Sequence, residues 1–220
     1  MKKIIISTLL ICVAFVSCKN EKAKEKTEDV VVTEVSTITD GSYITNVENS
    51  TLNWRGFKPT GTHNGTVNIK EGNLTVADGK LVGGNFVFDM STITVLDIPA
   101  EDEYNGKLVG HLSNPDFFDV EKNPTTTFEI VEVVYGDNTS VKGNLTIKGI
   151  TKSIEFPVVL ANTDTGLELE GVAFKIDRTE FDIRFKSQKF FNDLKDHLLS
   201  HKYAYEIEDN DLLIIEKYTI

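Results

Sequence analysis

The sequence predicts an all-β protein, an antiparallel β-barrel of about eight strands with one or two short helices. Apolar and polar residues alternate in many short stretches, as they do in strands that bury one face. Glycine-, asparagine- and aspartate-rich turns separate these stretches at short intervals. The chain has 220 residues, of which 40% are apolar, so it can build one substantial core.

The alternating stretches give the expected strands and their inward faces. Leu52 shares a face with Trp54, and Phe86 shares one with Phe88, because side chains two apart point the same way. The clearest stretches are 51–55, 65–70, 85–89, 127–132, 144–148 and 153–156. We expect hairpin corners at Gly72-Asn73, Asp78-Gly79, Gly83-Gly84, Gly136 to Asn138, and Thr163 to Gly166.

Residues 98–124 break the alternation and contain the expected helix. Leu108, Val109 and Leu112 fit one face of a short helix. Asn114 as a cap, with Pro115 at the first helical position, predicts a further helical turn. Residues 190–194 are a second helical candidate, and the closing strand is expected near residues 212–215.

The N-terminus predicts a lipoprotein signal peptide over residues 1–17. Two lysines precede an apolar run at 4–16 that is shorter than the ~20 residues needed to span a bilayer. The run ends in Phe15-Val16-Ser17-Cys18, which resembles a bacterial lipobox, so we expect Cys18 to carry the lipid. The alternative is an ordinary secretory signal with a chance cysteine.

Residues 18–41 are expected to be the lipidated cysteine and a disordered, charged tether, followed by the barrel domain at 42–220. Residues 19–29 contain no aromatic side chain and little that could be buried. The chain has two cysteines, Cys12 and Cys18, so no disulfide can form within the barrel domain.

The net charge and the absence of known catalytic motifs argue against several classes of function. The net charge of −11 disfavours nucleic acid as a partner, because phosphate backbones repel an acidic protein. We expect no catalytic residues, because no nucleophile elbow, phosphate-binding glycine loop or zinc-protease motif occurs. His197 and His201 lie four residues apart without a clear third ligand, so we expect no metal and no cofactor.

Several ordered motifs resemble one family, the YceI-like proteins, which are lipocalin-like barrels that bind polyisoprenoid-type lipids. The match runs from about Thr51 to Leu194. It is carried by Gly110-His-Leu-Ser-Asn-Pro-Asp-Phe-Phe-Asp-Val120, by residues 124–128, 141–151 and 174–181, and by Trp54 and His63-Asn64-Gly65. A barrel of ~8 strands is just wide enough for one small ligand or for its own side chains.

The resemblance implies that an apolar chain lipid, polyisoprenoid or fatty-acyl, binds inside the barrel. The protein would then be a carrier or buffer in the bacterial cell envelope, anchored by its lipid to the membrane on the periplasmic or outer-surface face. A homodimer is left open. The expected ligand-binding residues are Trp54, Phe86, Phe88, Phe117, Phe118, Phe128, Phe156, Phe174, His63 and His111.

Three other interpretations stay open at this point. The same phenylalanines could fill a closed core, which alternation alone favours. An enzyme could act on an apolar substrate inside the barrel, with His63 or His111 as its acid–base groups. The acidic exterior could instead contact a protein partner.

Overall fold

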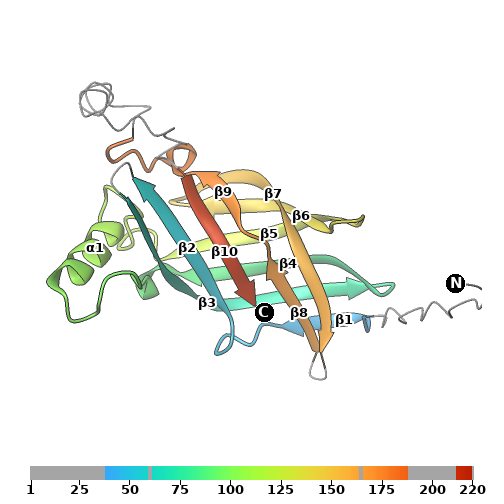
Figure 1. Cartoon of the computed structure of the whole chain (residues 1–220). Coiled ribbons are helices and arrows are strands. Elements are labelled where there is room, and N and C mark those ends of the chain that lie inside the picture. The colour runs from blue at the N-terminus through green and yellow to red at the C-terminus, as the bar shows by residue number, and fades with distance from the viewer. Residues whose placement is uncertain (1–37, 59–60, 164–165, 188–211, 220) are drawn as a thin grey trace, which may run out of the picture. The chain divides into compact units, whose positions relative to one another are not determined.

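The computed structural model describes residues 38–58, 61–163, 166–187 and 212–219. Over these residues, antiparallel strands form a nearly closed barrel with one α-helix and short 3-10 turns (Figure 1). The elements are β1 (Gly41–Ile44), β2 (Thr51–Lys58), β3 (Gly61–Ala77), β4 (Lys80–Asp89), η1 (Met90–Thr92), α1 (Glu103–Ser113), β5 (Thr125–Val134), β6 (Ser140–Ile147), β7 (Ile150–Thr163), β8 (Gly166–Gly171), β9 (Phe174–Asp177), η2 (Arg178–Phe181) and β10 (Leu212–Thr219).

The sheet closes through two short strands that share one position in the wall. The strand order is β8-β7-β6-β5-β4-β3-β2-β10-β9, and β1 pairs with β3. Only Val172 and Ala173 separate β8, which pairs with β7, from β9, which pairs with β10. Counting β8 and β9 as one position gives eight wall positions in the described residues, so the predicted antiparallel barrel is confirmed.

The turn predictions were right at some corners and wrong at others. Asp78 (φ 52°) and Gly79 (φ 67°) form the tight β3–β4 turn, as expected. Gly72 and the Gly83-Gly84 pair instead lie inside long strands. At Gly72 and Gly84 the small size is needed, because a Cβ would lie 2.5 Å from the Phe86 ring and 2.6 Å from the Asn73 carbonyl oxygen, respectively.

Helix α1 confirms the predicted helix, and in the described residues directly after it, 114–124, no further helix forms. Asp102 caps α1 by accepting a hydrogen bond from the Tyr104 N–H at 2.9 Å. Asn114 caps a turn as predicted, because its Oδ1 accepts from the Asp116 N–H at 2.9 Å and its carbonyl accepts from the Phe117 N–H at 3.1 Å, but this turn does not continue into a helix. After it the chain folds back, and the Phe118 N–H donates to the Leu112 carbonyl at 3.1 Å.

Several predicted features lie outside the described residues. These are the signal peptide, Cys18, the tether up to residue 37, the helical candidate at 190–194, and His197 and His201. Strand β10 includes the predicted closing strand and extends it to Thr219. None of the helices in the described parts is both long and apolar enough to traverse a bilayer.

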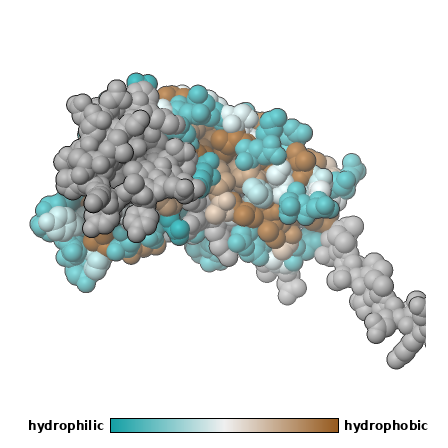
Figure 2. Space-filling model, turned by 45° about the horizontal axis from the view of Figure 1, so that its top comes forward, coloured by the Kyte–Doolittle hydropathy of each residue, from teal (hydrophilic) through white to brown (hydrophobic). Residues whose placement is uncertain are grey.

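The barrel interior differs at its two ends. At the end formed by the β3–β4 turn, opposite α1 in Figure 1, aliphatic side chains are packed together and almost fully buried. They are Leu74, Val76, Leu81, Val141, Val158, Leu167 and Leu169. Toward α1 the interior becomes aromatic. Outside, hydrophilic and apolar residues are interspersed over the face shown in Figure 2.

Candidate functional site

The α1 half of the barrel contains a cavity of about 50 Å³. Its lining surface is apolar, although Thr126 is among the lining residues. Pockets that bury whole drug-sized ligands measure roughly 300–1,000 Å³, so in this conformation side chains fill most of the interior. The lining residues are Leu52, Trp54, Val67, Phe86, Phe88, Met90, Ile93, Phe118, Thr126, Phe128, Leu145, Ile147, Ile154, Phe156 and Phe174.

Strand alternation and register bring the aromatic side chains of the lining together. Phe86 on β4 lies directly opposite Phe128 on β5. The Phe128 ring lies 5.3 Å from that of Phe156 on β7, and Phe156 stacks on Phe174 of β9 at 4.2 Å with nearly parallel rings. No β7–β9 ladder is seen in the described residues, so this stacked pair spans the junction between the two strands.

Trp54 lies across two glycines on the inner face of β2 and β3. Gly65 is its cross-strand partner, and a Cβ there would lie 2.9 Å from Trp54 Cε2 and 1.8 Å from the Thr94 carbonyl oxygen. A Cβ on Gly56 would lie 3.8 Å from the other side of the indole, at Cζ3. The indole is thus held in place, with 5% of Trp54 exposed.

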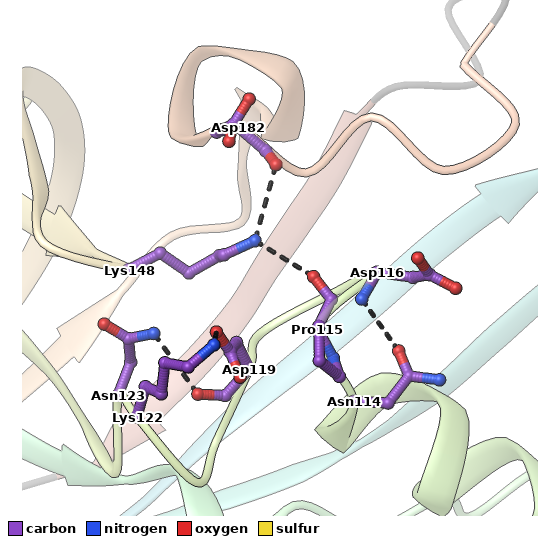
Figure 3. A network of polar contacts seen from close by, with 8 residues as sticks. All are labelled: Asn114, Pro115, Asp116, Asp119, Lys122, Asn123, Lys148 and Asp182. Atoms are coloured by element: carbon purple, nitrogen blue, oxygen red, sulfur yellow. Dashed lines mark hydrogen bonds and ion pairs between the residues drawn. The ribbon is translucent and has the colours of Figure 1, made fainter.

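A polar network fixes the loop that carries Phe118 (Figure 3). The Lys148 ammonium, on the β6–β7 turn, donates to the Pro115 carbonyl at 3.3 Å and to the Asp182 carbonyl at 3.4 Å. Asn114 Oδ1 accepts from the Asp116 N–H at 2.9 Å. Segments distant in sequence are therefore joined at this end of the barrel.

Seven of the ten predicted ligand-binding residues line the cavity. They are Trp54, Phe86, Phe88, Phe118, Phe128, Phe156 and Phe174. The other three, Phe117, His63 and His111, are not among the lining residues. That these residues line the cavity shows where they lie and not that they contact a ligand, so their assignment as ligand-binding residues stays a prediction.

Phe117 and His111 belong to a separate aromatic cluster. The His111 ring meets Phe117 edge-on at 5.0 Å and Phe185 at 4.4 Å. The Asn114 amide donates to His111 Nδ1 at 3.2 Å, while Nε2 is buried without a hydrogen-bond partner among the described residues. The Arg178 guanidinium lies 5.5 Å from the Phe117 ring and donates to the Ile183 and Phe185 carbonyls. This cluster joins α1 to the chain after β9.

His63 lies at the end of β3 and is part of a contact with the segment before α1. Its Nδ1 is 2.7 Å from Asp97 Oδ2, and Asp97 Oδ1 accepts from the Asn64 N–H at 2.9 Å. Burial alone would raise the pKa of Asp97, but the hydrogen bonds from Asn64 and His63 outweigh it and lower the pKa below its ordinary value. The pair therefore fastens a loop.

Sequence reasoning missed several lining residues as ligand contacts. Leu145 and Ile147 alternate with polar residues in a stretch that the sequence predicts to be a strand, so the pattern indicates that both side chains point inward. Ile93 follows a 3-10 turn and Thr126 is polar, so no apolar periodicity marks either of them. No group of three or more metal-ligating side chains comes together in the described parts of the chain.

These observations define a class of protein: an antiparallel β-barrel with an apolar cavity at one end, lined by aromatic and aliphatic side chains. The chain belongs to the YceI-like domain family, whose model matches residues 43–201.

Curated relatives match over a short segment. The chain is 51% identical over 45 residues to a UPF0312 protein of Pseudomonas aeruginosa strain LESB58, which is 20% of this chain and 24% of that protein. A UPF0312 protein of Pseudomonas paraeruginosa matches equally over 45 residues. The chain thus spans about a quarter of the length of these relatives.

Solved structures share the fold. Burkholderia cenocepacia BcnA superposes with a TM-score of 0.59 at 17% identity, over 79% of this chain and 97% of BcnA. A polyisoprenoid binding domain from Saccharophagus degradans, implicated in plant cell wall breakdown, gives 0.52 at 10% identity, over 82% of this chain and 97% of that one. At these identities the likeness establishes the fold alone.

Proposed function

We propose that this protein binds an apolar chain lipid, of polyisoprenoid or fatty-acyl type, inside its barrel. The cavity and its lining carry the proposal, because aromatic and aliphatic side chains from seven strands and from the chain around α1 form most of the lining. Each CH₂ group moved from water into such surroundings contributes roughly 0.8 kcal/mol. The S. degradans domain, which shares the fold, is a polyisoprenoid binding domain, and this supports the same ligand class.

A cavity of about 50 Å³ admits only a small part of such a chain, so binding requires the lining to move. The side chains best placed to move are those not held by a backbone ladder between their strands. Phe174 is half-buried and meets Phe156 across the β7–β9 junction by ring stacking. We expect these two rings to separate when a chain enters.

Binding rather than catalysis is the proposed activity. The lining offers apolar side chains and one threonine, which suits the retention of a hydrocarbon and not proton transfer. His63 and His111, the groups considered for acid–base work, make contacts that fix loops. We further propose a carrier or buffer role in the cell envelope, with the lipid on Cys18 as the anchor.

Native mass spectrometry of the full chain, purified from its membrane fraction in a mild detergent, tests the proposal. Wild type is expected to carry a non-covalent apolar adduct. Ile154→Phe, on the inner face of β7, adds volume to the cavity and should reduce adduct occupancy at least fivefold. Val159→Phe, on the same strand but 54% exposed, should leave it unchanged.

Circular dichroism checks that both variants keep the barrel. A wild-type protein that stays free of adduct, and takes up none when incubated with farnesol or palmitoyl ester vesicles, would overturn the proposed function. Equal occupancy in Ile154→Phe and Val159→Phe would place the ligand elsewhere.

A further inference from the structure

The cavity ends partway along the barrel, at a similar level on neighbouring strands. On β5 its lining includes Thr126 and Phe128 but not Ile130, which is the next inward residue and is buried. On β7 the lining includes Phe156 but not Val158, which is also the next inward residue and buried. The cavity is therefore bounded on the side of the β3–β4 turn, which is called the deep end below.

The ring of Phe128 occupies the space just beyond this level. Phe128 pairs with Leu145 of β6, yet its ring covers Gly143, which lies two residues closer to the deep end on that strand. A Cβ on Gly143 would lie 2.5 Å from the ring, so the ring is in close contact with the backbone there. A ligand chain that goes deeper would need the space that this ring fills.

The ring of Phe86 lies beside that of Phe128 and is held in a similar way. Phe86 pairs with Phe128 on one side and with Gly72 of β3 on the other, where a Cβ would lie 2.5 Å from the Phe86 ring. Backbone ladders join β3, β4, β5 and β6. The two rings are therefore buried between paired strands, whereas no ladder joins β7 to β9, the strand that carries Phe174.

Beyond the two rings the barrel is filled and its wall is closed. The aliphatic side chains of the deep end are packed together and almost fully buried. Strand β1 pairs with β3 there, and Asp40 Oδ1, just before β1, accepts from the Gly79 N–H of the β3–β4 turn at 2.8 Å. Tyr43 of β1 lies next to the start of β8, because a Cβ on Gly166 would be 3.8 Å from its ring. Passage of a ligand through the deep end would require these contacts to separate.

The lined part of the barrel is much shorter than its wall. From Phe86 to Met90 the lining follows the chain for four residues, which is about 13 Å at about 3.3 Å per residue. Strand β4 has 10 residues, so it is about 33 Å long. An extended hexadecyl chain is longer than the lined part and shorter than the strand, so it distinguishes a cavity with a floor from an open tube.

We infer that Phe86 and Phe128 are specificity-determining residues: their rings form a fixed floor to the cavity and limit the length of apolar chain that the barrel buries. The inference rests on the proposed lipid binding and narrows its ligand class. The barrel buries only the terminal stretch of a long chain, while the remaining chain and the polar headgroup stay outside at the α1 end.

Alkyl maltosides from octyl to hexadecyl, used below their micelle concentrations, test the inference on the full-length protein. The bulky sugar keeps the headgroup outside, so the chain length sets how deep a probe reaches. Each buried CH₂ should lower Kd roughly fourfold, and Kd should stop falling before hexadecyl, once the chain reaches the floor. The emission of Trp54, a lining residue and the one tryptophan of the chain, follows binding.

Three variants locate the limit. Phe128→Ala removes the ring that covers Gly143, so Kd should continue to fall for longer chains than in wild type. Phe128→Leu should move the limit in the same direction by less, with a smaller loss of packing. Phe88→Ala removes the same ring from β4 closer to α1, so it should weaken all probes and leave the limiting length unchanged. Circular dichroism checks that each variant keeps the barrel.

The outcomes separate this inference from the proposed function. Wild type whose Kd falls steadily up to hexadecyl overturns the floor and leaves lipid binding intact. A limit that stays in place in both Phe128 variants, or that moves equally in Phe88→Ala, also overturns it. Failure of wild type to bind any of the probes overturns the proposed function itself. If neither Phe128 variant folds, the length series of the wild type still decides.

Discussion

Glycines shape the interior of this barrel more than its corners. Gly65, Gly72, Gly84 and Gly143 lie in strands, and a Cβ at any of them would come within 3 Å of a neighbouring backbone or side-chain atom. At Gly143 the ring of Phe128 occupies the space where a side chain would be, at 2.5 Å. Aromatic side chains thus cover strand glycines inside the barrel, which explains how a narrow barrel accommodates so many rings.

Gly65→Ala should lower the free energy of unfolding by about 2–3 kcal/mol, a typical cost of inserting an atom into a packed site. The new methyl would clash with the Thr94 carbonyl and displace Trp54. Gly106→Ala is the matched control, because a Cβ there meets nothing within 4 Å and alanine favours helix α1. Urea unfolding followed by Trp54 emission measures both, and equal stability of the two variants would contradict this packing.

The segment from Thr92 to Asp97 is hydrogen-bonded along the edge of β3 as a neighbouring strand would be, although it is not itself a strand. It follows the edge of β3 beyond the point where β4 ends. Thr92 and Thr94 hydroxyls accept from the Asn68 and Thr66 N–H groups at 2.9 and 3.0 Å. Asp97 completes this edge by accepting from Asn64. The segment closes the wall beside Trp54 and leads into α1.

Asp97→Asn should destabilise the protein at pH 7 by about 1 kcal/mol, because a charged acceptor is lost from the contact with His63 and Asn64. The folded state lowers the pKa of Asp97 below its ordinary 3.8. Its contribution is therefore present above the unfolded pKa and is lost as the pH falls through the folded pKa.

The difference between wild type and Asp97→Asn should accordingly shrink below pH 4 and vanish in stronger acid. Urea unfolding from pH 7 to pH 3 measures it. Asp137→Asn, in the exposed β5–β6 loop, should follow wild type throughout. A difference that is constant across this range would show that the carboxylate charge of Asp97 does not hold the segment.

At the scale of the whole molecule, alternation predicted the barrel because each strand buries one face, and that pattern is local. Phe86, Phe88 and Phe128 were placed inside for the same reason. The positions of Phe117 and His111 outside the cavity lining do not follow from a pattern, because the loop after α1 has no periodicity and its path depends on contacts with Lys148 and Phe185. The cavity volume could not be predicted either, because it depends on how rings from different strands interlock.

The sequence pattern also did not predict that two short strands, β8 and β9, share one position in the barrel wall. Both strands are short, and the two residues between them carry no turn signal. Strand β7 changes its pairing partner partway along its length. Strand β7 pairs with β6 up to Pro157 and with β8 from Val158 onward. The barrel therefore closes by side-chain stacking at the level of the cavity, where the proposed ligand must be accommodated.

The membrane anchor is the last expectation to test, and the two cysteines of the chain provide the variant and its control. A single acyl chain binds membranes with K on the order of 10⁴ M⁻¹, so stable attachment needs several chains. Cys18→Ala should abolish incorporation of a palmitate label and move the protein from the detergent phase to the aqueous phase. Cys12→Ala, in the expected signal peptide, should retain both properties. Label that persists in Cys18→Ala would refute lipidation at this residue, whereas lipid binding by the barrel would be unaffected.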